Sequence, residues 1–240
     1  MSNPEKIVLG NGLDGESYVG KSTAIETMKN IESLREKGII IVPEYAVIGK
    51  FINFPRETNQ DLKNAIKIII DLEKKRTDIL SDGLAKNKES VVLFDRSPIS
   101  CIAFEHAAEK AGFKGAALWM AEAFQQALGD KKIIVPHGII HLTASRQVIQ
   151  KRRKKDLSNG NGEIIDFLKD TDVIKNINYA FNAFGDFLPK QLFLTLNTDN
   201  KSTEEVGAIV LQFITNQDES AENFIPDFVS YAEKLINKKI

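Results

Sequence analysis

Five short apolar segments alternate with longer amphipathic segments along the 240 residues, and this alternation constrains the fold more than any other feature of the chain. The apolar segments are rich in Ile, Val and Leu, which is typical of strands buried on both faces. They cover Ile7–Gly10, Ile39–Pro43, Val91–Asp95, Ile139–Thr143 and Leu192–Asn197. Because a parallel pair of strands needs a long crossover, the alternation predicts parallel strands with helices on both faces of the sheet.

The segments between these strands have helical periodicity. They cover Lys21–Lys37, Asp61–Lys88, Ile102–Gly112, Ala116–Leu128, Ser145–Lys155, Val173–Phe187, Thr203–Thr215 and Phe228–Lys238. Ser81–Gly83 is a candidate break in the second of them. No internal repeat and no linker rich in Pro, Gly or Ser divides the sequence, so we expect residues 1–240 to form a single domain.

The charge balance disfavours a nucleic-acid-binding protein. The 32 Lys and Arg residues are offset by 33 Asp and Glu residues, whereas a protein that wraps nucleic acid is usually strongly basic. Charged residues interrupt every apolar run well before the ~18 residues that a membrane span needs. The single cysteine, Cys101, excludes an internal disulfide and is compatible with a reducing compartment. The sequence therefore predicts a cytoplasmic protein with no membrane or nucleic-acid partner.

A glycine-rich segment follows the first predicted strand and precedes the first predicted helix. Gly15 to Ser22, with the sequence GESYVGKS, fits the pattern G-x-x-x-x-G-K-[ST] of a phosphate-binding loop. Gly15 and Gly20 let the backbone turn its N–H groups toward one anion, and the following helix adds the positive end of its dipole. We expect Lys21 to reach the β- and γ-phosphates and the Ser22 hydroxyl to bind Mg²⁺, with Thr23 completing the site.

The approach to this loop is irregular. Such a loop usually begins where the first strand ends, but five residues, Gly10 to Asp14, separate Leu9 from Gly15. Two interpretations stay open. Either the strand runs on past Leu9, or the loop is three residues longer than usual.

Polar residues also follow the second and third predicted strands, at the edge where open α/β sheets bind ligands. Glu44 is a candidate general base for a hydroxyl acceptor, or else a charged residue at a strand end. Asp95 is placed to hold hydrated Mg²⁺, and Arg96 to offer the acceptor a fixed cation. The alternative is that this segment only caps the next helix through Ser97.

A basic helix follows the fourth predicted strand. Arg146 and Arg153 are seven residues apart and should share a face of this helix, whose most basic part is Lys151–Lys155. Together with the Asn-Gly pairs that follow, residues 145–163 suit a lid over the triphosphate, with Arg153 acting on the transferred phosphoryl group and Arg146 on the nucleotide. The alternative is a solvated cationic face. An RNA-binding role is disfavoured because no aromatic residue interrupts the run.

With these motifs in this order, the chain resembles the deoxynucleoside kinase and thymidylate kinase group of P-loop kinases, from Lys6 to Asn197. The resemblance implies a three-layer α/β/α sandwich around a five-stranded parallel sheet, with Mg²⁺-ATP as donor. It further implies that Glu44 activates a 5′-hydroxyl and that Arg76 faces the acceptor. Tyr45 departs from the family, because deoxynucleoside kinases usually have a second proline there.

The leading interpretation is ATP-dependent phosphorylation of a nucleoside at its 5′-hydroxyl, with Glu44, Arg76 and Arg96 contacting the acceptor. The alternative acceptor is a nucleoside monophosphate, for which Arg56, Arg76 and Arg96 would matter more, as clamps on its phosphate. A further alternative is a nucleotide-binding regulatory protein, or an ATPase that hydrolyses without a small-molecule acceptor. The expected partner is a small nucleoside or nucleotide, and a homodimer is compatible with the sequence.

Overall fold

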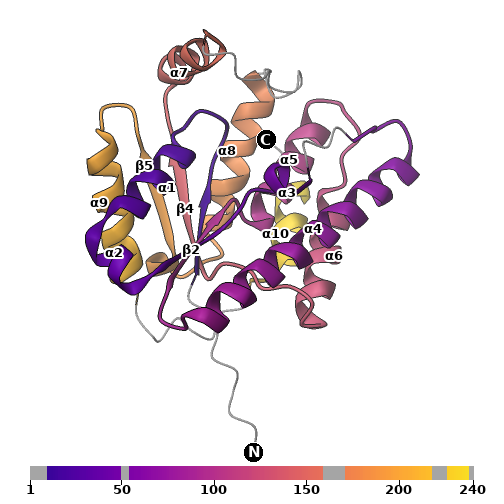
Figure 1. Cartoon of the computed structure of the whole chain (residues 1–240). Helices are drawn as coiled ribbons and strands as arrows, with labels where there is room; N and C mark the ends of the chain where they lie inside the picture. Colours follow the sequence, from indigo (N-terminus) through magenta and orange to yellow (C-terminus); the bar gives the residue numbers. More distant parts are fainter. Residues whose placement is uncertain (1–9, 50–53, 159–170, 218–225, 238–240) are drawn as a thin grey trace, which may run out of the picture.

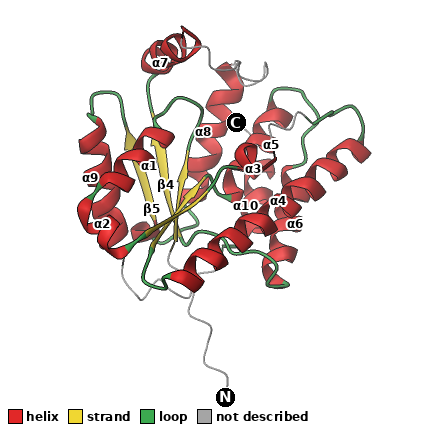
Figure 2. Cartoon of the chain, in the orientation of Figure 1, coloured by secondary structure: helices red, strands yellow, loops and turns green. Residues whose placement is uncertain are grey.

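The computed structural model describes residues 10–49, 54–158, 171–217 and 226–237. Its five strands form one parallel sheet in the order β2-β3-β1-β4-β5, which confirms the predicted architecture (Figure 2). The strands are β1 (Gly10–Asp14), β2 (Ile39–Val42), β3 (Val91–Asp95), β4 (Gly138–Thr143) and β5 (Phe193–Asn197). The strand that leads into the glycine-rich loop is therefore the central one.

Helices cover both faces of the sheet (Figure 1). They are α1 (Lys21–Asn30), α2 (Glu32–Lys37), α3 (Tyr45–Gly49), α4 (Asn59–Lys86), α5 (Pro98–Lys110), α6 (Ala117–Gly129), α7 (Arg146–Ser158), α8 (Thr171–Gly185), α9 (Thr203–Thr215) and α10 (Phe228–Asn237), with a 3₁₀ turn, η2, at Lys190–Leu192. In Figure 1, α1, α2 and α9 lie on one side of the sheet, and α5, α8 and α10 lie on the other. Helix α7 lies beyond the carboxyl ends of the strands, as expected for the predicted lid, although residues 159–163 of that lid lie outside the described residues.

Strand β4 shows why the predicted strands are continuous apolar runs rather than alternating ones. Ile139 packs into the cluster beneath α5, α6, α8 and α10, which contains Phe124 and Phe181. Its neighbour Ile140 points to the opposite face and packs with Met28 of α1. Successive side chains of a strand point to opposite faces, so a strand covered on both sides must be apolar throughout.

No helix in the four described ranges is long and apolar enough to cross a membrane.

The first strand lies further along the chain than predicted. The prediction was Ile7–Gly10, but the strand is Gly10–Asp14, and Ile7 to Leu9 lie outside the described residues. Periodicity missed it because Gly10 and Asn11 are not apolar. A Cβ on Gly10 would lie 2.6 Å from the Phe94 ring, and Asn11 is satisfied by paired hydrogen bonds with Gln217. The strand thus extends to Asp14, directly before Gly15, and the following loop has the usual spacing.

Several predicted helices also differ from the structure. The expected helix Lys21–Lys37 is two helices, because Ile31 takes an extended conformation between them. Helix α4 continues without a break through Ser81–Gly83, where Gly83 allows the helix to approach Ile40 of β2 closely. Helix α5 starts at Pro98, four residues earlier than predicted, because Ser97 caps it with Pro98 in the first turn. The short helix α3 was not predicted.

We predict that Gly15→Ala destabilises the fold by roughly 1–3 kcal/mol or more, because the backbone φ of +134° is strained for alanine and the new Cβ would lie 2.3 Å from the Leu142 carbonyl oxygen. Gly129→Ala is the matched control, since a Cβ there meets nothing within 4 Å. Urea unfolding of both variants measures the difference. Equal stability of the two variants would contradict the assigned geometry of Gly15.

Candidate functional site

The glycine-rich loop, residues 15–20, connects the central strand to the start of α1. Gly15, Tyr18 and Gly20 all have positive φ, at 134°, 67° and 105°. This conformation costs glycine little but strains Tyr18. No backbone N–H of residues 16–20 donates a hydrogen bond within the described part of the chain. The loop therefore holds free backbone donors beside the N-terminus of a helix, which is the arrangement that binds phosphate.

Two cationic side chains hold the first turn of this loop through its carbonyl oxygens. Lys21 Nζ donates to the oxygens of Gly15, at 3.3 Å, and Glu16, at 2.8 Å. Arg96 Nη1 donates to the same Gly15 oxygen at 3.0 Å. Burial, and then the charge of Arg96, lowers the pKa of Lys21 to about 7. The loop carbonyls thus serve as partners for Lys21 in the absence of an anion.

The last turn of the loop is held from the opposite flank. Thr198, at the end of β5, donates from Oγ1 to the Val19 oxygen at 2.8 Å. Arg152 of α7 donates from Nη1 to the Tyr18 oxygen at 3.1 Å, and it also donates to the Thr198 hydroxyl and carbonyl oxygens. Sequence analysis did not identify Arg152 or Thr198 individually. Thr198 could have been found as the first residue after a predicted strand, whereas the direction of Arg152 depends on the position of α7.

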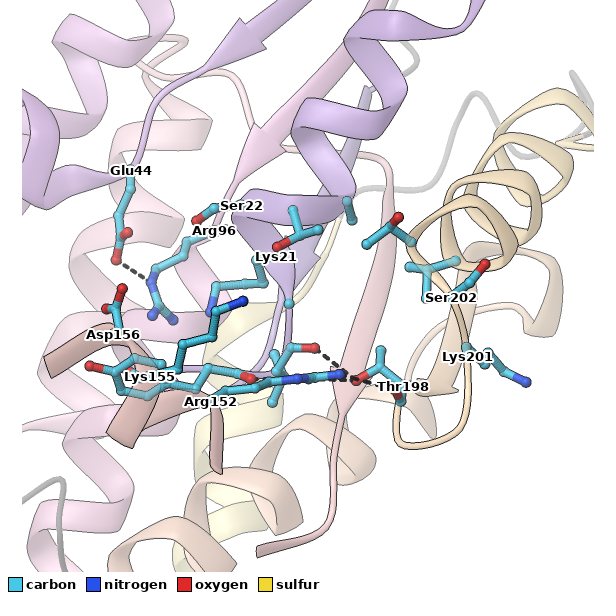
Figure 3. A pocket seen from close by; sticks show the side chains of 18 residues that line it. Lys21, Ser22, Glu44, Arg96, Arg152, Lys155, Asp156, Thr198, Lys201 and Ser202 are labelled. Carbon is cyan, nitrogen blue, oxygen red and sulfur yellow. Dashed lines mark hydrogen bonds and ion pairs between the residues drawn. The ribbon is translucent and has the colours of Figure 1, made fainter. Parts of the chain in front are cut away.

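A cavity of about 550 Å³ lies beside the loop, and we call it the larger cavity. In Figure 3, Lys21, Arg96 and Glu44 lie together on one side of it, and Thr198, Lys201 and Ser202 lie on the other. Its lining also includes the predicted residues Gly20, Ser22 and Thr23. Gly15, the first residue of the loop, is buried and does not line the cavity. It therefore contributes to the site through the turn of the backbone.

Glu44 and Arg96 form an ion pair at the edge of the larger cavity. Arg96 has a left-handed backbone, with φ at 67°, and its guanidinium lies 5.2 Å from the centre of the Phe104 ring. Burial alone would raise the pKa of Glu44, but the charge of Arg96 and its hydrogen bond outweigh burial and hold that pKa below its usual value. Glu44 is therefore a carboxylate that can accept a hydrogen bond but is a weak proton acceptor.

Asp95 has an unsatisfied oxygen next to this pair. Its Oδ1 is buried and has no hydrogen-bond partner within the described residues. Burial and the nearby charge of Glu44 raise the pKa of Asp95. An orphaned carboxylate oxygen suits a cation that prefers oxygen ligands, and the Ser22 hydroxyl on the cavity wall offers another such ligand. These two residues therefore fit a bound Mg²⁺.

Arg76, which the resemblance assigns to the acceptor, does not line the larger cavity. Its side chain is fully buried and pairs with Glu73 at 2.7 Å, and its guanidinium lies 4.3 Å from the centre of the Tyr45 ring. Burial alone would lower its pKa, but the charge of Glu73 outweighs burial and raises it. Arg76 Nη2 donates to the carbonyl oxygens of Asp95 and Arg96, at 3.2 and 2.5 Å. Arg76 thus supports the strained backbone that aims Arg96 at the loop.

Arg56 is also engaged within the protein. It makes two hydrogen bonds to the Glu105 carboxylate, at 2.8 and 2.7 Å, and a third to the Lys114 carbonyl oxygen. Glu105 in turn accepts from the backbone N–H of Ala116. Among the three arginines considered as clamps for an acceptor phosphate, Arg56, Arg76 and Arg96, each has a carboxylate partner.

The basic helix α7 presents arginines to two different cavities. Arg146, Gln150 and Arg153 line a cavity of about 120 Å³, the smaller cavity, which confirms that they share a face. Arg146, which was expected to contact the nucleotide, lines the smaller cavity, whereas Arg152 lines the larger one. Neighbouring residues on a helix point about 100° apart, so Arg152 and Arg153 face different cavities.

Asp14 is a further buried acidic residue that the motif analysis missed. It lies at the end of β1, and its Oδ1 accepts hydrogen bonds from the backbone N–H of Ser97 and the hydroxyl of Ser100. A carboxylate at the N-terminus of α5 is stabilised by the helix dipole. Asp14 therefore fixes the start of α5, and with it the position of Arg96, relative to the loop.

No protein-family model matches the chain, and no curated protein matches it. Among solved structures, the chain is similar to a thymidylate kinase from Candida albicans, with a TM-score of 0.57 and 16% sequence identity. The similarity covers 92% of this chain and 96% of that one. At this identity the likeness establishes the fold alone, a five-stranded parallel sheet with helices on both faces.

We predict that Arg76→Ala destabilises the protein by about 3–5 kcal/mol, because the change leaves the buried Glu73 carboxylate without its counter-ion. Arg35→Ala removes an exposed arginine and should change stability by less than about 0.5 kcal/mol. Urea unfolding of both variants checks this. An Arg76→Ala protein of near-normal stability would return Arg76 to the role of an acceptor contact.

We predict that binding of a nucleoside triphosphate takes up a proton above about pH 7, because bound phosphate restores the lowered pKa of Lys21 toward its usual value of 10.5. The affinity should therefore fall as the pH rises from about 7 to 9. The lowered pKa also destabilises the unliganded protein below about pH 7, and that penalty diminishes as the pH rises toward 10.5.

Calorimetric titrations in buffers with different ionisation enthalpies measure the proton uptake directly. Lys21→Met is the control, since it removes the titrating group and should abolish the buffer dependence. Identical proton uptake by the variant and the parent protein would contradict the assignment to Lys21.

Proposed function

We propose that this chain is an ATP-dependent phosphotransferase that acts on a nucleoside or a nucleotide. The observation that carries the proposal is that four features meet at one cavity. They are the glycine-rich loop, which we now call the phosphate loop, and the side chains of Lys21, Arg96 and Glu44. The loop offers free N–H groups and Lys21 a cation to the donor phosphates. Glu44 offers a hydrogen-bond acceptor to the attacking group. A site that only bound nucleotide would not need this last residue.

The residues suggest a division of roles in phosphoryl transfer. Lys21 would leave the loop carbonyls to contact the β- and γ-phosphates, and Arg96 would stabilise charge on the transferred group. Ser22 and Asp95 would hold Mg²⁺, which neutralises charge on the triphosphate when bound. The residues at the far side of the larger cavity, Thr198 and Ser202, would contact the nucleoside part of ATP.

We also propose that residues 1–240 act as a single domain with the lid at 145–163. None of the side chains of α7 is buried, so little packing holds this helix on the protein. Arg153, on the smaller cavity, would act on the transferred phosphoryl group, whereas Arg152 takes the donor role first expected of Arg146. A homodimer remains compatible with this proposal.

The likeness to a thymidylate kinase supports a nucleoside monophosphate as the acceptor. Such an acceptor is anionic, and its terminal oxygen attacks without the help of a base. It needs cations that are available to bind its phosphate. In this structure the candidate would be Arg153, which lines the smaller cavity, rather than the three arginines first considered.

A different observation supports an unphosphorylated nucleoside. Arg56, Arg76 and Arg96 are each paired with a carboxylate, so a phosphate would have to compete with Glu105, Glu73 or Glu44. A neutral nucleoside meets no such competition. Its hydroxyl could donate a hydrogen bond to Glu44, which remains a carboxylate at neutral pH. The side-chain geometry therefore favours the nucleoside, whereas the fold likeness favours the monophosphate.

A panel of nucleosides and nucleoside monophosphates, each with Mg²⁺-ATP, tests the proposal through ADP release and the phosphorylated product. We expect acceptor-dependent ADP release that Lys21→Ala abolishes without unfolding the protein. ADP release without any acceptor would favour a hydrolysing ATPase. Nucleotide binding with no turnover of any acceptor would favour a regulatory protein.

If the best acceptor is a nucleoside, we predict that Glu44→Gln lowers kcat about 10²-fold. This loss is at the lower end of the effect of general-base groups, because the low pKa of Glu44 makes it a weak base. ATP affinity should change little. If the best acceptor is a monophosphate, the same change should be mild. The kcat of the variant on its best acceptor is the measurement, and a near-normal kcat on a nucleoside would contradict the role of Glu44.

A further inference from the structure

A chain of three polar side chains connects β4 and α8 to the phosphate loop. Asn178 Nδ2 of α8 donates to Glu16 Oε1 at 3.2 Å, and Asn178 Oδ1 lies 3.2 Å from His141 Nε2 of β4. Glu16 is 5% exposed and His141 is fully buried. Glu16 is the second residue of the loop, and its own carbonyl oxygen accepts the shorter hydrogen bond of Lys21. This series of hydrogen bonds therefore ends on Glu16, the residue whose carbonyl oxygen holds Lys21.

The donor and acceptor groups of Glu16, Asn178 and His141 determine the direction of each hydrogen bond between them. A carboxylate only accepts, so Asn178 must turn its nitrogen toward Glu16 and its oxygen toward His141. His141 Nε2 must then carry the hydrogen, which fixes the tautomer of the ring. The imidazole is stacked on the Phe181 ring, with centroids 4.7 Å apart. A stacked, buried ring cannot reorient easily, so it holds the Asn178 amide in one orientation.

We propose that Asn178 is a positioning residue of the phosphate loop, oriented by His141 and acting through the Glu16 carboxylate. The other anchors hold loop carbonyls, through Arg96, Thr198 and Arg152. Asn178 holds a loop side chain instead, and it does so from α8, the helix whose Ile177 lines the smaller cavity together with Glu16. Its effect is to keep the Glu16 peptide where Lys21 and the free N–H groups can receive phosphate.

This inference rests on the proposed function only in that the loop binds a nucleoside triphosphate. Its test is therefore the equilibrium affinity for Mg²⁺-ATP, which needs no acceptor. Asn178→Ala and Glu16→Ala each remove the hydrogen bond, and each should weaken Mg²⁺-ATP binding about tenfold, as expected for one hydrogen bond to a charged group. Because the two changes remove the same interaction, the double variant should bind no more weakly than either single variant.

Glu16→Gln separates the hydrogen bond from the charge. Its side-chain oxygen still accepts from Asn178, so this variant should bind Mg²⁺-ATP within about twofold of the parent protein. Asn176→Ala, on the same helix, is the matched control and should also be unchanged. In an active enzyme, the KM for ATP should rise in Asn178→Ala while the KM for the acceptor stays constant, which general damage to the fold would not produce.

Thermal unfolding without nucleotide shows whether each variant is folded. If Asn178→Ala does not fold, Glu16→Ala carries the test, because Glu16 lies in a loop and belongs to no apolar cluster. Additive losses in the double variant, or equal losses in Glu16→Gln and Glu16→Ala, would overturn the positioning role. A parent protein that binds Mg²⁺-ATP but phosphorylates no acceptor would overturn only the proposed function. A parent protein that does not bind Mg²⁺-ATP would overturn both.

Discussion

The site depends on one physical arrangement, the capture of the carbonyl oxygens of the phosphate loop by side chains around it. Lys21 and Arg96 hold Gly15, Thr198 holds Val19, and Arg152 holds Tyr18. The positive φ of Tyr18 strains this short loop, and a strained backbone persists only where its surroundings fix it. The N–H groups of residues 16–20 have no partner among the residues that the structure describes, which leaves them for an anion.

The anchor Arg96 is itself positioned by the sheet and its helices. Arg96 follows β3, and its backbone is held by Arg76 from α4, while Asp14 at the end of β1 holds the helix that follows. Buried charges on this scale are costly unless they are paired, and here Arg76 is paired with Glu73 and Arg96 with Glu44. The same pairing that stabilises the site reduces the number of cations available for an acceptor phosphate. Under the proposed function, this pairing bears on the choice of acceptor.

The sequence predicted the alternation of strands and helices along the chain, the parallel sheet, and a glycine-rich turn before the first helix, because these follow from apolar periodicity and glycine placement. It missed the position of β1, since a central strand of Gly and Asn is permitted by the close packing of Phe94 and by Gln217, which are distant in sequence. It assigned Arg76 to the acceptor, because only the fold shows that α4 buries this side chain. It singled out Arg146 and Arg153 but missed Arg152, because the direction of Arg152 depends on the placement of α7.

A crystal structure with Mg²⁺ and a non-hydrolysable ATP analogue would show whether the N–H groups of the loop bind phosphate. We expect the β- and γ-phosphates to lie on the N–H groups of residues 16–20, with Lys21 Nζ moved from the Gly15 and Glu16 oxygens onto the phosphates. The hydrogen bonds from Arg96 to Gly15 and from Thr198 to Val19 should remain, because they hold the loop in place. A triphosphate bound away from the loop, or Lys21 still bonded to the carbonyl oxygens beside it, would contradict the account.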